Sequence, residues 1–119
     1  MDNFQLSRLA RKVPHFRGVF MRNELKSPKR NESAIINLDT KRGTHWVAYV
    51  KQGNMAIYFD PFGLPPPVEL IRYLKNTRLF YFTDQVQRLT DTNCGQLCLK
   101  FLNKKWIHLR SRLPAGLRY

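Results

Sequence analysis

The chain has 119 residues, which is enough for one domain with a single hydrophobic core and too few for two. Hydrophobic residues make up 43% of it, including eight Phe, five Tyr and two Trp, so the composition excludes collagen, a coiled coil, a disulfide-stapled miniprotein and wholesale disorder. Lysine and arginine number 21 against 8 acidic residues, which gives a formal net charge of +13. Such a basic surface favours a polyanion as partner, most often nucleic acid; the alternative is that the charge only confers solubility.

The N-terminal part of the chain predicts one helix followed by two strands. Residues 4–12 carry apolar side chains at mixed helical spacing and stop before Pro14, which indicates a short amphipathic helix. Residues 16–21 form a β-rich run, residues 26–32 a polar loop, and residues 33–40 a buried strand. Nothing here resembles a secretory signal, and no stretch approaches the roughly 20 apolar residues of a membrane-spanning helix, so we expect an intracellular, soluble protein without a membrane partner.

Two further β-rich runs, residues 45–51 and 55–60, flank a polar turn at residues 52–54 and predict a hairpin. If the first two turn residues form the loop, His45 lies directly opposite Asp60. If the last two turn residues form the loop instead, the pairing shifts by one step. His45 and Asp60 still lie on the same face of the sheet, because the pleat has a period of two. A carboxylate beside an imidazole is the orienting half of a Cys/His/Asp site; the alternative is a polar contact at a strand end.

The C-terminal part predicts a helix, a strand, a second helix and a basic tail. The FGLPPP segment at residues 62–67 ends the sheet, and residues 67–76 open with proline and have helical spacing. Residues 79–82 are a further strand, and residues 94–102 should form the central buried helix. Residues 104–119 contain no acidic residue and five basic ones, so we expect a basic tail. The five are Lys104, Lys105, Arg110, Arg112 and Arg118.

The last helix begins with a cysteine. With Thr92 and Asn93 as candidate caps, Cys94 falls in the first turn, where backbone N–H groups and the helix dipole lower a thiol pKa and make a nucleophile; the alternative is a small buried residue. Cys98, four residues later, shares the helix face, and we expect both thiols to be reduced. The thiols and the scattered histidines lack zinc-ligand spacing, so we expect no metal site.

Three other side chains have two possible roles. Gln85 and Gln87 precede the nucleophile, where a side-chain amide can stabilise an oxyanion, although a loop glutamine is usually only solvated. Trp46 is either a core or cleft-wall aromatic or a residue packed over the imidazole of His45.

Together these motifs carry a family resemblance. Residues 43–46 (GTHW), 59–63 (FDPFG), Gln87 and residues 93–98 (NCGQLC) resemble the adenain family of adenovirus-type maturation proteases, which is related to the ubiquitin-like-protein proteases through the order His, acid, Gln, Cys. The resemblance covers residues 43–102. It implies an α+β, papain-like cysteine protease fold of the adenain type, with a small mixed sheet packed on a central helix that carries the nucleophile. We expect one minimal adenain-like domain over residues 1–119, with residues 104–119 as its basic tail.

The resemblance also implies roles for individual residues. Cys94 is the nucleophile, His45 the general base and then acid, Asp60 the orienting carboxylate, and Gln87 the oxyanion-hole donor, with Gln85 as the outside candidate. Asp60 is the acid common in ubiquitin-like-protein proteases, whereas adenovirus enzymes have glutamate there. Adenovirus enzymes also continue well beyond the nucleophile, while 25 residues follow Cys94 here.

The function implied is a cysteine endopeptidase that processes viral, or virus-like transposon, capsid and core precursor proteins during virion maturation, in the host nucleus and the virion. No small-molecule cofactor is implied; double-stranded DNA, bound without sequence preference, is the expected activator, and no activating peptide is identified. Candidate DNA contacts are basic residues of the first helix, the polar loop and the tail: Arg8, Arg11, Lys12, Lys29, Arg30, Lys104, Lys105, Arg110 and Arg112. The alternatives are a deconjugating protease for ubiquitin-like proteins and a catalytically inactive, basic DNA-binding virion protein. The oligomeric state stays open.

Overall fold

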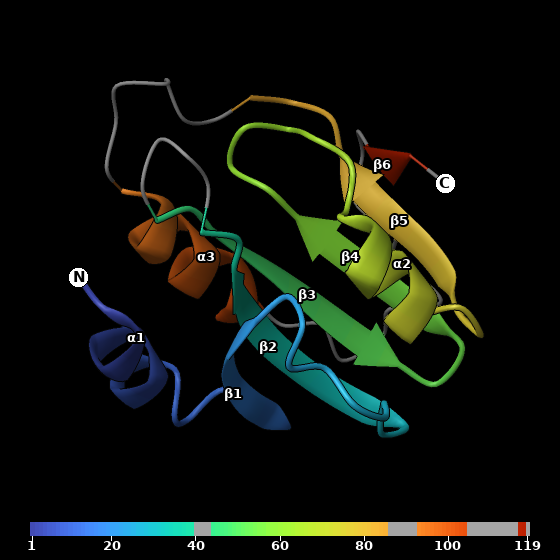
Figure 1. The fold of residues 1–119 in the computed structure, drawn as a ribbon, viewed down its shortest axis with the longest axis horizontal. Helices are drawn as coiled ribbons and strands as arrows, with labels where there is room; N and C mark the ends of the chain where they lie inside the picture. Colours follow the sequence, from blue (N-terminus) through green and yellow to red (C-terminus); the bar gives the residue numbers. More distant parts are fainter. Residues whose placement is uncertain (40–43, 86–92, 105–116, 119) are drawn as a thin grey trace.

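A computed structural model describes residues 1–39, 44–85, 93–104 and 117–118, and it shows a mixed β-sheet with helices on both faces (Figure 1). The sheet has six strands whose order in space follows their order in the chain. Pairs β1/β2 and β4/β5 are parallel, and the other neighbours are antiparallel. The strands are β1 (Phe16–Met21), β2 (Asn31–Asn37), β3 (Trp46–Gln52), β4 (Met55–Phe59), β5 (Arg78–Phe82) and β6 (Leu117–Arg118).

The helices divide the core into two layers. Helices α1 (Asn3–Leu9) and α3 (Cys94–Leu102) cover one face of the sheet, and α2 (Val68–Tyr73) covers the other. The central strand β3 sends alternate side chains into the two layers, with Ala48 packed in the α3 layer and Tyr49 in the α2 layer. The expected α+β architecture, with a small mixed sheet packed on the helix that begins at Cys94, is confirmed.

Helix α1 is shorter than the predicted range of residues 4–12. A capping box starts it, because the Asp2 carboxylate accepts from the Gln5 N–H at 2.9 Å and the Gln5 side chain accepts from the Asp2 N–H at 2.8 Å. Leu6 is its buried residue, and it joins the core beneath α3.

Strand β2 begins at Asn31 and ends at Asn37, so both of its ends come earlier in the chain than those of the predicted strand at residues 33–40. Asn31 and Glu32 pair with the far end of β3, so the polar loop gives two of its residues to the sheet. Asp39, with φ of +47°, ends the extended run, and residue 40 lies outside the described residues. The sequence analysis did not place Glu32 in the strand because it is charged. A fully buried glutamate needs partners that a sequence pattern does not show.

The β3–β4 hairpin has the later of its two possible loops. Gln52 pairs with Met55, which leaves Gly53 and Asn54 as the loop, and Gly53 has φ of +57°, a conformation that glycine adopts without strain. His45 precedes β3 and Asp60 follows β4. Both functional candidates therefore stand at the same end of the hairpin.

In the C-terminal part, α3 has the predicted bounds, and α2 is shorter than the predicted helix at residues 67–76. The predicted basic tail is corrected in one respect: its residues 117–118 form β6, antiparallel to β5. Residues 105–116 and 119 lie outside the described part of the chain. Within the described residues, no helix has the length and apolar character needed to cross a membrane.

Candidate active site

His45 and Asp60 form a buried pair at the end of the hairpin. The His45 Nε2 atom lies 2.8 Å from the Asp60 Oδ1 atom, and the two residues are only 6% and 2% exposed. The same carboxylate oxygen accepts from the backbone N–H of Phe62 at 2.7 Å. Because these two bonds fix the carboxylate, Asp60 holds the imidazole in one orientation. The predicted contact is present.

Phe62 lies flat against the imidazole of His45, with ring centroids 4.4 Å apart and an interplanar angle of 11°. It extends the β3–β4 register, in which Phe62 is the position across from His45. The sequence analysis included this phenylalanine in the FDPFG motif but did not predict its contact with His45. A hairpin with Gly53 and Asn54 as its loop predicts that contact. Trp46 is 5% exposed and packs in the core, so the core interpretation of that residue is correct.

Cys94 is the first residue of α3, which packs on β3. Its thiol lies near enough to His45 for the imidazole to lower the pKa of the thiol. Since Asp60 occupies Nε2, the ring nitrogen left for the thiol is Nδ1. The structure thus brings Cys94, His45 and Asp60 together, although they come from α3, the residue before β3 and the residue after β4.

The environments of the thiol and the imidazole shift their pKa values toward each other. Burial alone would lower the pKa of His45, but the hydrogen bonds and charges of Asp60 and Cys94 outweigh it and raise that pKa to about 9. Burial alone would raise the pKa of Cys94, but the hydrogen bond with His45 and the backbone N–H groups of Trp46 and Gly95 lower it. This arrangement favours a thiolate–imidazolium pair, which is a ready nucleophile beside a ready acid.

Cys98 is a buried thiol of a different kind. It is fully buried, burial raises its pKa well above the ordinary value, and its S–H donates to the carbonyl of Trp46 at 3.3 Å. The Trp46 peptide therefore contacts both thiols, since its N–H stabilises the Cys94 thiolate. Of the two cysteines, only Cys94 has the environment of a nucleophile.

Asn3 in α1 reaches across to the same tryptophan. Its Oδ1 atom accepts from Trp46 Nε1 at 2.9 Å and from Asn37 Nδ2 at 3.2 Å. The Trp46 ring in turn lies against Gly95, where an added Cβ would stand 3.2 Å from Trp46 Cε3. Sequence reasoning missed Asn3, and no local pattern signals a contact between residues 43 positions apart.

The last residue of the FDPFG motif has a steric role. Gly63 has φ of +71°, and a Cβ there would stand 2.5 Å from the carbonyl oxygen of Thr83, so this backbone approach requires glycine. The approach holds the end of the motif against the segment that leads to Gln85, an exposed residue. Gln87 lies outside the described residues, so its predicted oxyanion role stays a prediction.

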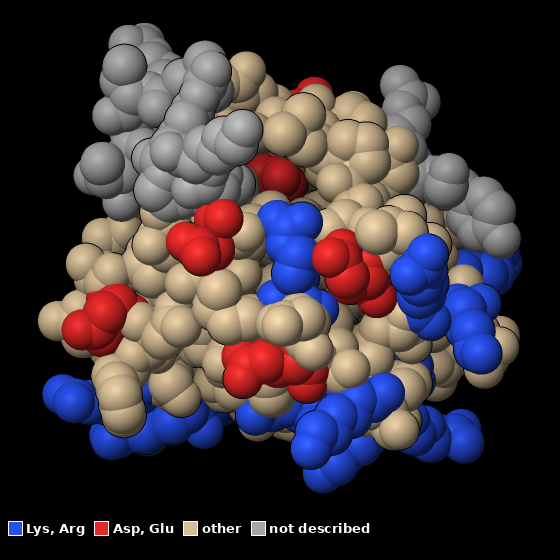
Figure 2. Space-filling view, in the orientation of Figure 1, with Lys and Arg blue, Asp and Glu red and all other residues tan. Residues whose placement is uncertain are grey.

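The described cations are distributed over the surface rather than gathered at the catalytic residues. Figure 2 shows lysine and arginine side chains along the lower edge of one face, below α1 and around the start of β2. Among the predicted DNA contacts, Arg8, Arg11, Lys12, Lys29, Arg30 and Lys104 are exposed. Lys105, Arg110 and Arg112 fall outside the described residues. In the described ranges, no cluster of three or more His, Cys, Asp or Glu residues could hold a metal ion.

Comparison of the sequence finds no matching family model and no matching curated protein. Among solved structures, the ASFV pS273R protease is similar, with a TM-score of 0.61 and 20% sequence identity. The match covers 85% of this chain and 55% of that chain, so the protein spans little more than half the length of that protease. The likeness shows a shared fold.

Proposed function

We propose that the protein is a cysteine endopeptidase that cleaves peptide bonds through a thioester on Cys94. One observation carries this proposal: the thiol of Cys94 adjoins the buried His45–Asp60 pair, with pKa shifts that favour the charged thiol and the charged imidazole. The fold shared with the ASFV pS273R protease supports the same reaction class.

The proposed reaction follows from these positions. The Cys94 thiolate attacks the substrate carbonyl carbon and forms a C–S bond, and the imidazolium of His45 then gives its proton to the leaving amine as the C–N bond breaks. In the second half, His45 takes a proton from water, the water oxygen attacks the thioester, and Cys94 leaves as the thiolate. Asp60 keeps the ring oriented and stabilises its charged form. The Cys94 N–H and, by resemblance, Gln87 would bind the developing oxyanion.

We further propose that the substrates are viral, or virus-like transposon, capsid and core precursors, cleaved in the host nucleus and the virion. Two observations support this finer proposal. The order His45, Asp60, Gln87, Cys94 is that of the adenain family, and the fold is that of a protease from ASFV.

A thiol-directed probe with a peptide-like acyl group, such as a peptidyl vinyl sulfone, tests the proposed function. We expect it to label the wild-type protein and Cys98→Ala at Cys94, and to leave Cys94→Ala unlabelled. Labelling that depends on Cys98, or no labelling of folded wild-type protein, would overturn the proposal and would favour an inactive, basic DNA-binding protein.

Double-stranded DNA is the proposed activator. The support is the net charge of +13 together with exposed cations in and just after α1 and in the loop before β2, such as Arg8, Arg11 and Lys29. Because such contacts are to phosphates, affinity should fall with salt at a logarithmic slope of roughly −0.9 per phosphate neutralised, and it should not depend on the DNA sequence.

Fluorescence anisotropy with two unrelated duplexes should give similar affinities, and probe labelling should rise when either duplex is added. Absence of binding at low salt would remove DNA as activator and leave the charge to solubility.

A further inference from the structure

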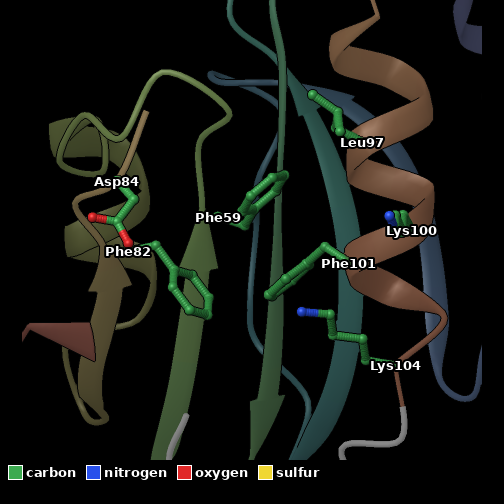
Figure 3. Close-up of a pocket in the computed structure, with 7 residues that line it drawn as sticks. All are labelled: Phe59, Phe82, Asp84, Leu97, Lys100, Phe101 and Lys104. Atoms are coloured by element: carbon green, nitrogen blue, oxygen red, sulfur yellow. The ribbon is translucent and has the colours of Figure 1, made fainter. Parts of the chain in front are cut away.

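A pocket lies between α3 and the ends of β4 and β5 (Figure 3). Its volume is about 290 Å³, which suits one or two side chains rather than a large cofactor. Four apolar residues form most of its wall: Phe59, Phe82, Leu97 and Phe101. The reaction proposed above uses none of them.

Three rings give the pocket a fixed shape. Phe59 and Phe101 are stacked, with centroids 5.1 Å apart, and Phe82 meets each of them edge-on at 6.3 Å. Phe101 is buried, whereas Phe59 and Phe82 are partly exposed. Because the rings hold one another, the pocket is preformed and offers apolar contact without a cost of ordering.

The pocket connects to the catalytic residues through the chain itself. Phe59 directly precedes Asp60, and Leu97 lies three residues after Cys94 on α3. At 1.5 Å of rise per helical residue, the pocket extends along α3 from roughly 4 to 10 Å beyond the nucleophile. An extended peptide advances about 3.3 Å per residue, so a side chain in the pocket belongs to a residue roughly one to three positions from the scissile bond.

The rim of the pocket carries charge. Lys100 on α3 and Lys104, two residues beyond its end, are exposed, and Figure 3 shows the Lys104 ammonium group reaching toward the aromatic rings. Asp84 stands on the opposite side beside Phe82. An acidic group bound on the α3 side would meet two cations, whereas a basic group there would be repelled.

We propose that this pocket takes a large apolar side chain of the substrate polypeptide, and that Lys100 and Lys104 bind an acidic residue beside it. The inference rests on the proposed function and adds to it the chemical class of sequence that the enzyme selects. The pocket buries the apolar side chain, and the two lysines select a negative charge on the substrate residue beside it.

Cleavage-site profiling tests both parts of the inference. Wild-type protein is incubated with a library of natural peptides, and mass spectrometry identifies the new termini. We expect a large apolar residue to be enriched at one fixed position one to three residues from the cut, with aspartate or glutamate enriched next to it. Cleavage without enrichment at any such position would overturn the proposal while leaving the protease function intact.

Variants separate the pocket from general effects. Lys100→Glu with Lys104→Glu should reverse the flanking preference from acidic to basic, with a change of about fivefold or more in the ratio of the two classes. Lys75→Glu with Arg72→Glu, an exposed pair near α2, makes the same change in net charge and should leave the profile unchanged. Leu97→Trp, which fills the pocket, should lower the enrichment of large apolar residues about tenfold.

The outcomes distinguish failure of the inference from failure of the proposed function. Because the lysines are exposed, their reversal does not endanger folding, and the vinyl sulfone probe should still label Cys94 in every variant. Probe labelling with an unchanged cleavage profile in the charge-reversal variant overturns the inference alone. Loss of probe labelling in the wild-type protein overturns the proposed function, and the inference with it.

Discussion

Among the described residues two carboxylates are buried, at opposite ends of the β3–β4 hairpin, and the partners of each differ in kind. Asp60 is 2% exposed and contacts the imidazole of His45. Glu32 is 1% exposed and accepts from the hydroxyls of Tyr49 at 2.7 Å and Tyr73 at 2.8 Å, and from the backbone N–H of Lys29 at 2.6 Å. Both carboxylates are satisfied, so burial alone does not tell the two regions apart.

The difference lies in the pKa values of the partners. Burial and the charge of Glu32 raise the pKa of Tyr49 far above its ordinary value and that of Tyr73 to about 12, so these hydroxyls keep their protons at physiological pH. The pKa of His45 is about 9, and that of the neighbouring Cys94 is lowered. A buried carboxylate therefore fixes structure when its partners hold their protons, and supports chemistry when a partner can pass a proton to a third group.

Removal of Asp60 should have the largest effect. Asp60→Ala deletes the acceptor for His45 Nε2 and the charge that raises the pKa of His45, and we expect turnover to fall roughly 1000-fold. Asp60→Asn should be intermediate, because an amide oxygen still accepts from Nε2 but carries no charge. Steady-state hydrolysis of a peptide identified by profiling measures this, with circular dichroism to confirm folding. Wild-type turnover in Asp60→Ala would place Asp60 with Glu32, as a structural carboxylate.

Removal of Glu32 should affect stability instead. Glu32→Ala leaves two hydroxyls and one backbone N–H without their acceptor, and we expect the free energy of unfolding to fall by about 3 kcal/mol. Glu32→Gln should cost less, because its amide oxygen can still accept. Urea denaturation measures the loss, and probe labelling of Cys94 under native conditions should not change. Slower labelling in the folded variants would show that the two regions are coupled.

The pH dependence of alkylation should separate the two thiols. At neutral pH, iodoacetamide should modify Cys94 at least about 100 times faster than Cys98, because the pKa of Cys94 is lowered and that of Cys98 is raised. Turnover also needs the proton on His45, so it should decline as pH rises through about 9, where the imidazolium loses that proton. Asp60→Asn should move this decline to lower pH. Mass spectrometry of alkylated peptides gives the rates, and equal modification of both cysteines would refute the nucleophile assignment.

Asn3 should have the smallest effect, because it acts through another residue. In Asn3→Leu the indole N–H of Trp46 loses its acceptor, and a loss of about 1 kcal/mol corresponds to a change of roughly fivefold in the alkylation rate of Cys94. The pH at which the alkylation rate of Cys94 begins to rise should also be higher in this variant, because the backbone N–H of Trp46 stabilises the thiolate. Asn3→Asp keeps the accepting oxygen and should restore the rate, whereas Asn23→Leu, an exposed control, should have no effect. An unchanged pH dependence of Cys94 alkylation in Asn3→Leu would show that the contact between α1 and Trp46 does not affect the thiol.

The elements of the fold could be predicted where the signal is local. Helix α3 has the predicted bounds because its cysteine, leucine and phenylalanine positions repeat at helical spacing, and β1 has the predicted bounds of residues 16–21. The start of β2 at Asn31 could not be predicted, because the partners that stabilise Glu32 come from β3 and from Tyr73 after a long connection. Strand β6 likewise depends on its pairing with β5 and not on its own two residues.

The site divides in the same way. His45 and Asp60 were predictable because a hairpin fixes which residues share a face, even when its loop is uncertain by one residue. The position of Cys94 against them followed from the family resemblance rather than from any local spacing. Asn3 and the aromatic pocket depend on α1 and α3 packing on the sheet, which a sequence pattern does not describe.

The order of the catalytic residues along the chain also sets an order in time. During synthesis the His45–Asp60 hairpin leaves the ribosome first, and Cys94 follows more than 30 residues later. Until α3 packs on β3, the Cys94 thiol lacks the hydrogen bond with His45 and the N–H of Trp46, so it has the pKa of an ordinary cysteine. Before this packing Cys94 is therefore no more reactive than an ordinary cysteine, and the reactive thiolate appears only once α3 has packed on β3.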